Sequence, residues 1–187
     1  MKRPGFLASS LVIGMVIVTA AAIVSQIDRK HPDPFTAARN GEAGHLSYHL
    51  TKDFDPNARN EDGETLLHLA LGEEGNYQSV RIILLSGADP ELDVNGEFPL
   101  HKAARANRLR EARLLVEKGA DPRRLDGRGL TPLHHIQGGN QAGMMVLQLV
   151  KAGAKLGDTD PSGLTARQHL ARIGDPAVDR LIEDLGD

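Results

Sequence analysis

Cysteine and tryptophan are absent from this chain of 187 residues, and aromatic residues make up only 3% of it. Without cysteine there is no disulfide framework, no thiolate nucleophile and no cysteine-ligated zinc or iron–sulfur site. So few aromatic rings leave little for base stacking, and a net charge of −3 gives no whole-chain attraction to a polyanion. We therefore expect no nucleic-acid partner. The hydrophobic fraction of 40% is too high for a disordered chain, so the core must be built from Leu, Ile, Val and Ala.

Charge is also absent from residues 4–27, a run that is densely apolar between Phe6 and Val24. A membrane-spanning helix needs about 20 mostly apolar residues, whereas the apolar stretch of a secretory signal has about 7–15 and ends at a small-residue cleavage site. The run is longer than a typical signal, although its three consecutive alanines offer a cleavage site. The sequence therefore predicts a signal anchor at 1–30 that enters the membrane through residues 6–27. A cleaved signal peptide is the alternative, and in both cases a second domain follows at 31–187.

The orientation of this segment follows from the charges beside it. Lys2 and Arg3 precede the run and Arg29 and Lys30 follow it, so the positive-inside count is nearly balanced. A short basic start ahead of a long apolar run is the usual form of an export signal, which places the bulk of the chain outside the cytoplasm. The composition, rich in Ala, Arg and Leu, favours a bacterial source. We therefore expect a single-pass protein of the bacterial inner membrane with its second domain in the periplasm, or a soluble periplasmic protein after signal cleavage.

A six-residue block recurs in the second domain with a period of 33 residues. The blocks T-L-L-H-L-A, F-P-L-H-K-A and T-P-L-H-H-I begin at Thr65, Phe98 and Thr131, and a degenerate copy begins at Thr165. A Gly-Ala pair follows each of the three complete blocks. This period and the T-P-L-H-x-A signature resemble those of the ankyrin repeat, and the resemblance covers roughly residues 32–187.

The resemblance implies an all-α fold, an ankyrin-repeat solenoid of about five helix-turn-helix repeats preceded by one N-terminal hydrophobic helix. Local chemistry agrees, because Thr caps the free N–H groups of a helix and Pro at the first helical position sacrifices no hydrogen bond. One such unit cannot bury its own apolar face, so the units must stack. Gly41, Asn107 and Gly174 stand at the bend between helices and are expected to adopt positive φ. The repeats are expected at about 32–60, 61–93, 94–126, 127–160 and 161–187.

Eight histidines raise the question of a metal or catalytic site. His68, His101 and His134 occupy the motif's own His position, where the family uses the imidazole to bridge neighbouring repeats. His45 and His49 are four residues apart and can share a helix face, but no third ligand stands at a metal-site spacing. Hydrolase, P-loop and dinucleotide-binding signatures are also absent from the sequence. We therefore expect no enzyme, no catalytic residue, no cofactor and no metal, and keep a metal-dependent activity around His45 and His49 as an alternative.

Charge is distributed unevenly along the repeats. Residues 53–97 hold eleven acidic residues and two basic ones, whereas residues 98–130 hold nine basic residues and four acidic ones. A solenoid would place these as consecutive acidic and basic stretches. Two interpretations are open: a plain solvated surface, or a dipolar surface that steers and orients a partner of opposite pattern.

In ankyrin proteins the partner usually lies on the concave face, against the turn tips and the ends of the first helices. The resemblance therefore predicts a non-enzymatic protein–protein interaction module facing the periplasm. Small exported bacterial ankyrin proteins that it resembles suggest an envelope enzyme as partner, for example an antioxidant enzyme such as catalase, and a toxin is the alternative partner. A membrane-tethered structural scaffold without a single dedicated partner is the alternative function. By motif position, the candidate partner-binding residues are Glu61, Asp62, Glu64, Glu73, Glu74, Val94, Asn95, Glu97, Arg105, Ala106, Arg128, Leu130 and Gln137.

Overall fold

The computed structural model describes residues 31–72 and 76–186 of the chain. The chain divides into two compact units, Met1–Asp33 and Pro34–Asp187. The membrane segment predicted at 6–27 and the candidate residues Glu73 and Glu74 lie outside the described residues. Among the described residues, every helix is too short or too polar to cross a bilayer.

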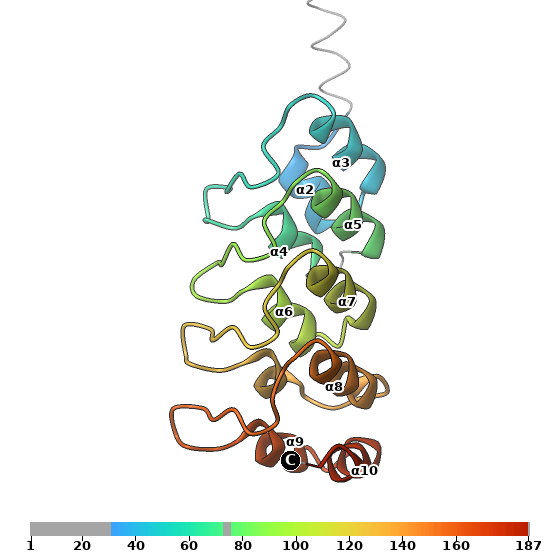
Figure 1. Cartoon of the computed structure of the whole chain (residues 1–187). Coiled ribbons are helices and arrows are strands. Elements are labelled where there is room, and N and C mark those ends of the chain that lie inside the picture. Colours follow the sequence, from blue (N-terminus) through green and yellow to red (C-terminus); the bar gives the residue numbers. More distant parts are fainter. Residues whose placement is uncertain (1–30, 73–75, 187) are drawn as a thin grey trace, which may run out of the picture. The chain divides into compact units, whose positions relative to one another are not determined.

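The unit Pro34–Asp187 consists of short helices arranged in antiparallel pairs that stack on one another (Figure 1). Strands are absent from the described residues, where only isolated bridges occur, so the predicted all-α architecture is confirmed. The first helix of each pair is, in order, α2 (Pro34–Arg39), α4 (Leu66–Ala70), α6 (Pro99–Arg105), the 3-10 helix η1 (Pro132–His135) and α9 (Ala166–Ala171). The second helix of each pair is α3 (Ala43–Leu50), α5 (Tyr77–Leu85), α7 (Leu109–Glu117), α8 (Ala142–Lys151) and α10 (Pro176–Asp184).

The local chemistry of the motif accounts for where the helices begin and turn. The hydroxyl of Thr65 accepts a hydrogen bond from the backbone N–H of His68, which satisfies one of the free donors at the start of α4. At the bend between helices, Gly41, Asn107 and Gly174 have φ of 70°, 52° and 69°. The expected positive φ at these bends is therefore confirmed.

The core lies between the two layers of helices and runs through the whole stack. The three first helices that carry a complete block contribute the motif leucine, and Leu67, Leu100 and Leu133 are at most 2% exposed. Leu115 in α7 and Leu149 in α8 are fully buried from the other layer. Burial of one such side chain stabilises the fold by about 1.5–3 kcal/mol. The stacking of repeats is thus the source of stability, because no single pair of helices encloses these side chains.

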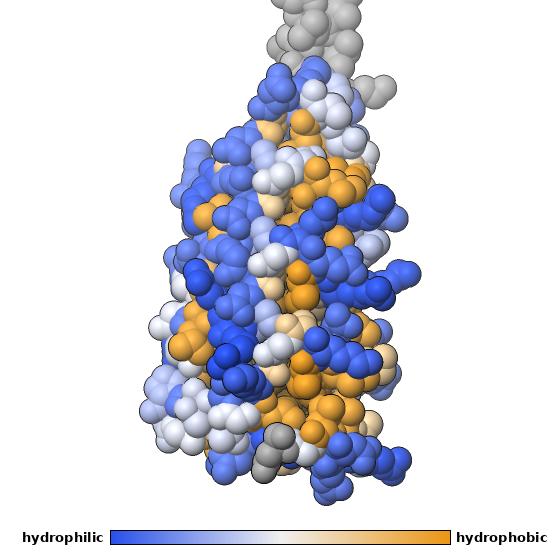
Figure 2. Space-filling view, in the orientation of Figure 1, coloured by the Kyte–Doolittle hydropathy of each residue, from blue (hydrophilic) through white to orange (hydrophobic). Residues whose placement is uncertain are grey.

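Hairpin-like turns connect the repeats and project from one side of the stack (Figure 1). Successive turns are tied together: the N–H of Gly127 donates to the carbonyl of Gly96 at 2.8 Å, and the guanidinium of Arg59 donates to the carbonyl of Asp93 at 2.7 Å. Figure 2 shows that hydrophilic residues gather on the side of the turns, while apolar residues are more frequent toward the side of the second helices. The turn tips therefore form an ordered polar edge.

Repeat four departs from the expected short helix. Its motif forms only one 3-10 turn, and Ile136 then takes an extended conformation with φ −69° and ψ 126°. Gly138 and Gly139, in the extra residues of this repeat, have φ of 93° and 104°. These positive φ values turn the chain away before a second helical turn can form, while Ile136 remains fully buried.

Candidate functional site

The three motif histidines form a ladder of hydrogen bonds between neighbouring repeats. Each ring lies almost completely buried, and its Nε2 faces a backbone carbonyl, which can only accept. The bridging function expected of these residues is therefore confirmed. The Nε2–H of His68 donates to the Glu97 carbonyl at 2.9 Å, that of His101 to the Leu130 carbonyl at 3.0 Å, and that of His134 to the Leu164 carbonyl at 3.4 Å.

Burial keeps two of these rings neutral. Desolvation lowers the pKa of His68 to about 4, although the hydrogen bond to Glu97 opposes it. Desolvation also lowers the pKa of His101 to about 4, and the nearby ring of His135 adds to this effect. Near neutral pH both rings are therefore uncharged hydrogen-bond donors that fix the positions of the turn tips.

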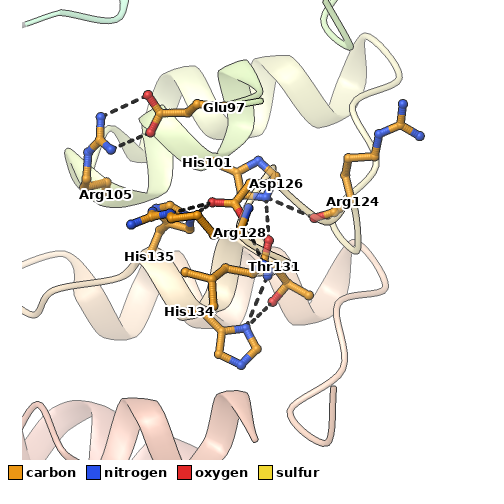
Figure 3. Close-up of polar contacts among 10 residues, drawn as sticks. Glu97, His101, Arg105, Arg124, Asp126, Arg128, Thr131, His134 and His135 are labelled. Carbon is orange, nitrogen blue, oxygen red and sulfur yellow. Dashed lines mark hydrogen bonds and ion pairs between the residues drawn. The ribbon is translucent and has the colours of Figure 1, made fainter. Parts of the chain in front are cut away.

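The second nitrogen of the ring has a partner in repeats two and four but not in repeat three. The hydroxyls of Thr65 and Thr131 lie 2.9 and 2.8 Å from the Nδ1 atoms of their histidines. Phe98 stands at the same motif position and offers no hydroxyl, and the buried Nδ1 of His101 has no hydrogen-bond partner among the described residues. The His101 ring instead packs edge to face on His135, with centroids 5.1 Å apart (Figure 3).

Restoring the hydroxyl should stabilise this repeat. We expect Phe98→Thr to raise the free energy of unfolding by about 1 kcal/mol, because it supplies an N-cap and a partner for the His101 Nδ1. Loss of the contact between Phe98 and the Arg124 guanidinium, 4.8 Å from the ring centroid, limits the gain. The converse variant Thr65→Val should cost a similar amount. Urea unfolding of both variants measures this, and a destabilised Phe98→Thr protein would contradict the interpretation.

Six of the candidate partner-binding residues line one cleft between the turn tips and the first helices of repeats two to four. This cleft has a volume of about 440 Å³ and is called cleft 1 here. The six candidates on its wall are Glu64, Val94, Asn95, Glu97, Arg105 and Arg128, and they are joined there by His68, Lys102 and Asp126.

A second cleft lies against the bend between the helices. It has a volume of about 590 Å³ and is called cleft 2 here. Three candidates line it, Arg105, Ala106 and Gln137, and its wall also includes Lys102. Since Arg105 and Lys102 line both clefts, the two clefts adjoin. The other lining residues of cleft 2 are Leu71, Gly72 and Arg108.

Three described candidates lie outside both clefts. Glu61 and Asp62 are exposed at the tip of repeat two. Leu130 is half-buried, and its carbonyl receives the hydrogen bond from His101. The structure therefore brings eight of the candidates together on two adjoining clefts and separates three from them.

Ion pairs neutralise much of the charge that the sequence distributes in blocks. Arg105 holds the carboxylate of Glu97 with two nitrogens, at 2.5 and 3.1 Å (Figure 3). Arg124 lies 3.3 Å from Glu91. Both pairs join the basic stretch at 98–130 to the acidic stretch before it, so the two stretches partly cancel at their border. Sequence reasoning missed these pairs, because they depend on side-chain directions across the stack.

A buried pair that sequence reasoning also missed supports the tip of repeat four. The Nε2 of His135 lies 2.9 Å from the Asp126 carboxylate, and both side chains are only 3% exposed (Figure 3). Asp126 also accepts the backbone N–H groups of Arg128 and Leu130. Burial works against its ionised form, but the hydrogen bonds from Leu130 and His135 keep the pKa of Asp126 below its usual value. The carboxylate therefore stays charged and holds the turn.

The histidines considered as metal ligands are not assembled into a centre. The Nδ1 of His45 lies 2.8 Å from the Glu42 carboxylate. Within residues 31–72 and 76–186, no group of three or more His, Asp or Glu side chains is placed to hold a metal ion.

Stacked helix pairs, projecting turns and a histidine ladder define a helical repeat solenoid that presents one continuous surface. A family model for ankyrin repeats, in three copies, matches residues 35–126 and 68–160. The chain belongs to the ankyrin-repeat family, whose repeats are general protein–protein interaction modules and not enzymes.

The chain is similar to curated proteins of Homo sapiens and Pyrobaculum aerophilum. SH3 and multiple ankyrin repeat domains protein 1 of Homo sapiens is 37% identical over 118 residues, which cover 61% of this chain and 5% of that protein. Neurogenic locus notch homolog protein 4 of Homo sapiens is 33% identical over 145 residues, or 70% of this chain and 7% of that protein. A putative ankyrin repeat protein of Pyrobaculum aerophilum is 40% identical over 74 residues, or 39% of this chain and 27% of that protein. The chain thus spans only a small part of these relatives.

Proposed function

We propose that this chain is a non-enzymatic interaction module that docks one protein partner on the surface of clefts 1 and 2. The observation that supports the proposal is the convergence of eight candidate residues, from three successive repeats, on these two adjoining clefts. The histidine ladder holds the tips in place, so a partner would meet a preorganised surface and little ordering would be needed on binding.

The chemistry of the clefts agrees with binding and not with catalysis. His68 is the histidine on the wall of cleft 1, and both of its ring nitrogens are engaged, by Thr65 and by the Glu97 carbonyl. The pKa of this ring is about 4, which is too far below neutral pH for an efficient general acid or base.

We also propose that the module acts in the bacterial periplasm, held at the inner membrane by residues 6–27. The uncharged run of the sequence and the basic residues ahead of it support this. In that compartment the partner would be an envelope enzyme, such as the antioxidant enzyme catalase, or a toxin. A soluble periplasmic protein after signal cleavage is the alternative.

Photo-crosslinking in cells tests the docking surface. Arg128, at the tip on cleft 1, and Arg113, on α7 outside both clefts, have side chains 65% and 68% exposed, and each is paired with a neighbouring carboxylate. A photoreactive residue at position 128 should give one dominant adduct, and the same residue at position 113 should give none. A diffuse ladder from both positions would favour the structural scaffold, and no adduct from either would contradict docking.

Fractionation of the same cells tests the location. The adduct should stay with the inner membrane after a salt wash and should be reached by a protease added outside that membrane. A soluble adduct whose chain begins near Ile23 would establish signal cleavage instead, and protection from the protease would contradict the periplasmic orientation.

A further inference from the structure

Arginines neutralise the carboxylates of cleft 1. Among the residues that the structure describes, three carboxylates line this cleft, and each is paired with a different arginine. The pairs are Arg39 with Glu64 at 3.0 Å, Arg105 with Glu97 at 2.5 Å, and Arg128 with Asp126 at 3.3 Å.

Among the described side chains of cleft 1, Lys102 is the cation that has no carboxylate partner. It follows the motif histidine on α6, is half-buried, and lines both clefts. Its ammonium makes no hydrogen bond or ion pair with any residue that the structure describes. Desolvation lowers the pKa of Lys102, although the charges of Glu97 and Glu64 oppose this.

The wall of cleft 2 holds three cationic side chains, Lys102, Arg105 and Arg108, and no carboxylate is among its described lining residues. Arg105 is already paired with Glu97 and Arg108 lies 3.7 Å from Glu111, so Lys102 is again the cation with no ion pair among the described residues. The exposed amide of Gln137, on the same wall, can donate to a peptide carbonyl and accept from a peptide N–H. The two clefts together therefore offer a cationic anchor beside a group that pairs with main chain.

We propose that Lys102 binds a carboxylate of the partner, and that the partner presents an acidic peptide segment to clefts 1 and 2. The inference rests on the proposed function and names the chemistry of the partner. Each cleft, at about 440 and about 590 Å³, is far larger than a small inorganic anion, since a water molecule occupies about 30 Å³. A chain of linked residues fills such a surface, and its acidic side chains supply the missing countercharge.

This contact can contribute to the free energy of binding because the Lys102 ammonium is already partly desolvated before the partner binds. An exposed lysine exchanges a full hydration shell for an ion pair, and such pairs contribute little. Lys102 has already lost part of its hydration in the folded protein, so less is given up when a carboxylate arrives. A charge-assisted hydrogen bond to this ammonium is therefore stronger than one to a lysine in open solvent.

Two labelled peptides and three variants of the full chain test the proposal. The probes are fluorescein-labelled ten-residue peptides that are identical except that four Glu residues of one are Gln in the other. We expect the chain to bind the Glu peptide about tenfold more tightly, a difference of about 1.4 kcal/mol. Lys102→Met, which keeps the apolar stem, should abolish the preference, and Lys102→Arg should keep most of it. Lys118→Met, which removes an exposed charge outside both clefts, is the matched control and should keep it fully.

The outcomes separate this inference from the proposed function. No preference for the Glu peptide, a preference that survives in Lys102→Met, or an equal loss in Lys118→Met would overturn the proposal for Lys102. A single adduct at position 128 would in that case still support docking on cleft 1. Urea unfolding of Lys102→Met checks that the variant is folded, and we expect no loss of stability because no described residue forms a hydrogen bond or ion pair with the ammonium.

Discussion

Between pH 7 and pH 5, we expect the free energy of unfolding to fall by about 4 kcal/mol from two histidines alone. His68 and His101 have pKa values of about 4 in the folded protein, whereas an unfolded histidine has a pKa of about 6.5. In this pH range the unfolded chain binds more protons than the folded one, so stability falls as the pH falls below 6.5. The loss levels off only below pH 4, where the folded rings are protonated as well.

Urea unfolding at pH 7, 6 and 5 measures this dependence. The variants His68→Gln and His101→Gln keep an N–H donor for the bridged carbonyl but do not titrate, so each should remove about half of the two-histidine contribution. His135 and His169 also have lowered pKa values, chiefly through desolvation, and should leave a residual slope in the double variant.

Other groups act outside this window. Burial works against the ionised form of Asp126, but the Leu130 N–H and His135 hold its pKa below 3.8. Its contribution is therefore lost at more acidic pH. An unchanged slope in the double variant would show that the two buried rings do not limit stability in acid.

The fold could be predicted from the sequence because its determinants repeat at a fixed spacing. The motif at Thr65 and Thr131 contains the cap, the first turn and the bridging histidine in four consecutive residues. Each histidine meets its partner carbonyl in the neighbouring repeat, so one spacing of 33 residues determines the whole ladder. Repeat four was the exception, since two glycines with positive φ ended its first helix early.

The position of the candidate site could be predicted from the sequence, but the ion pairs that neutralise its charged side chains could not. Motif position located the tips and the helix ends that meet in cleft 1. It did not reveal that Arg105 is already held by Glu97, or that His135 is buried against Asp126, because these contacts depend on how side chains point across the stack. Lys102 was not among the candidates. The signal that pointed to it was the lysine in F-P-L-H-K-A, where the other two complete blocks have Leu and His.

A second large effect on the free energy of unfolding is expected where neighbouring turn tips approach each other closely. We expect Gly96→Ala to lower the free energy of unfolding by about 3–5 kcal/mol, from backbone strain, overpacking and a lost hydrogen bond. Gly96 has φ +80°, and a Cβ there would lie 2.9 Å from the Cα of Gly127. The two tips would have to separate, which would also weaken the hydrogen bond from the Gly127 N–H to the Gly96 carbonyl.

Gly63 provides a matched control, because it occupies the equivalent turn with almost the same φ, +79°, and has no atom within 4 Å of an added Cβ. Gly63→Ala should therefore cost only the strain of the left-handed conformation, about 1–2 kcal/mol. The difference between the two variants in urea unfolding isolates the contact between tips. Equal losses would show that the turn tips at Gly96 and Gly127 do not contact each other closely. With unequal losses, Gly96→Ala should also reduce the crosslink at position 128, since Arg128 follows Gly127 on the displaced turn and cleft 1 is built from both tips.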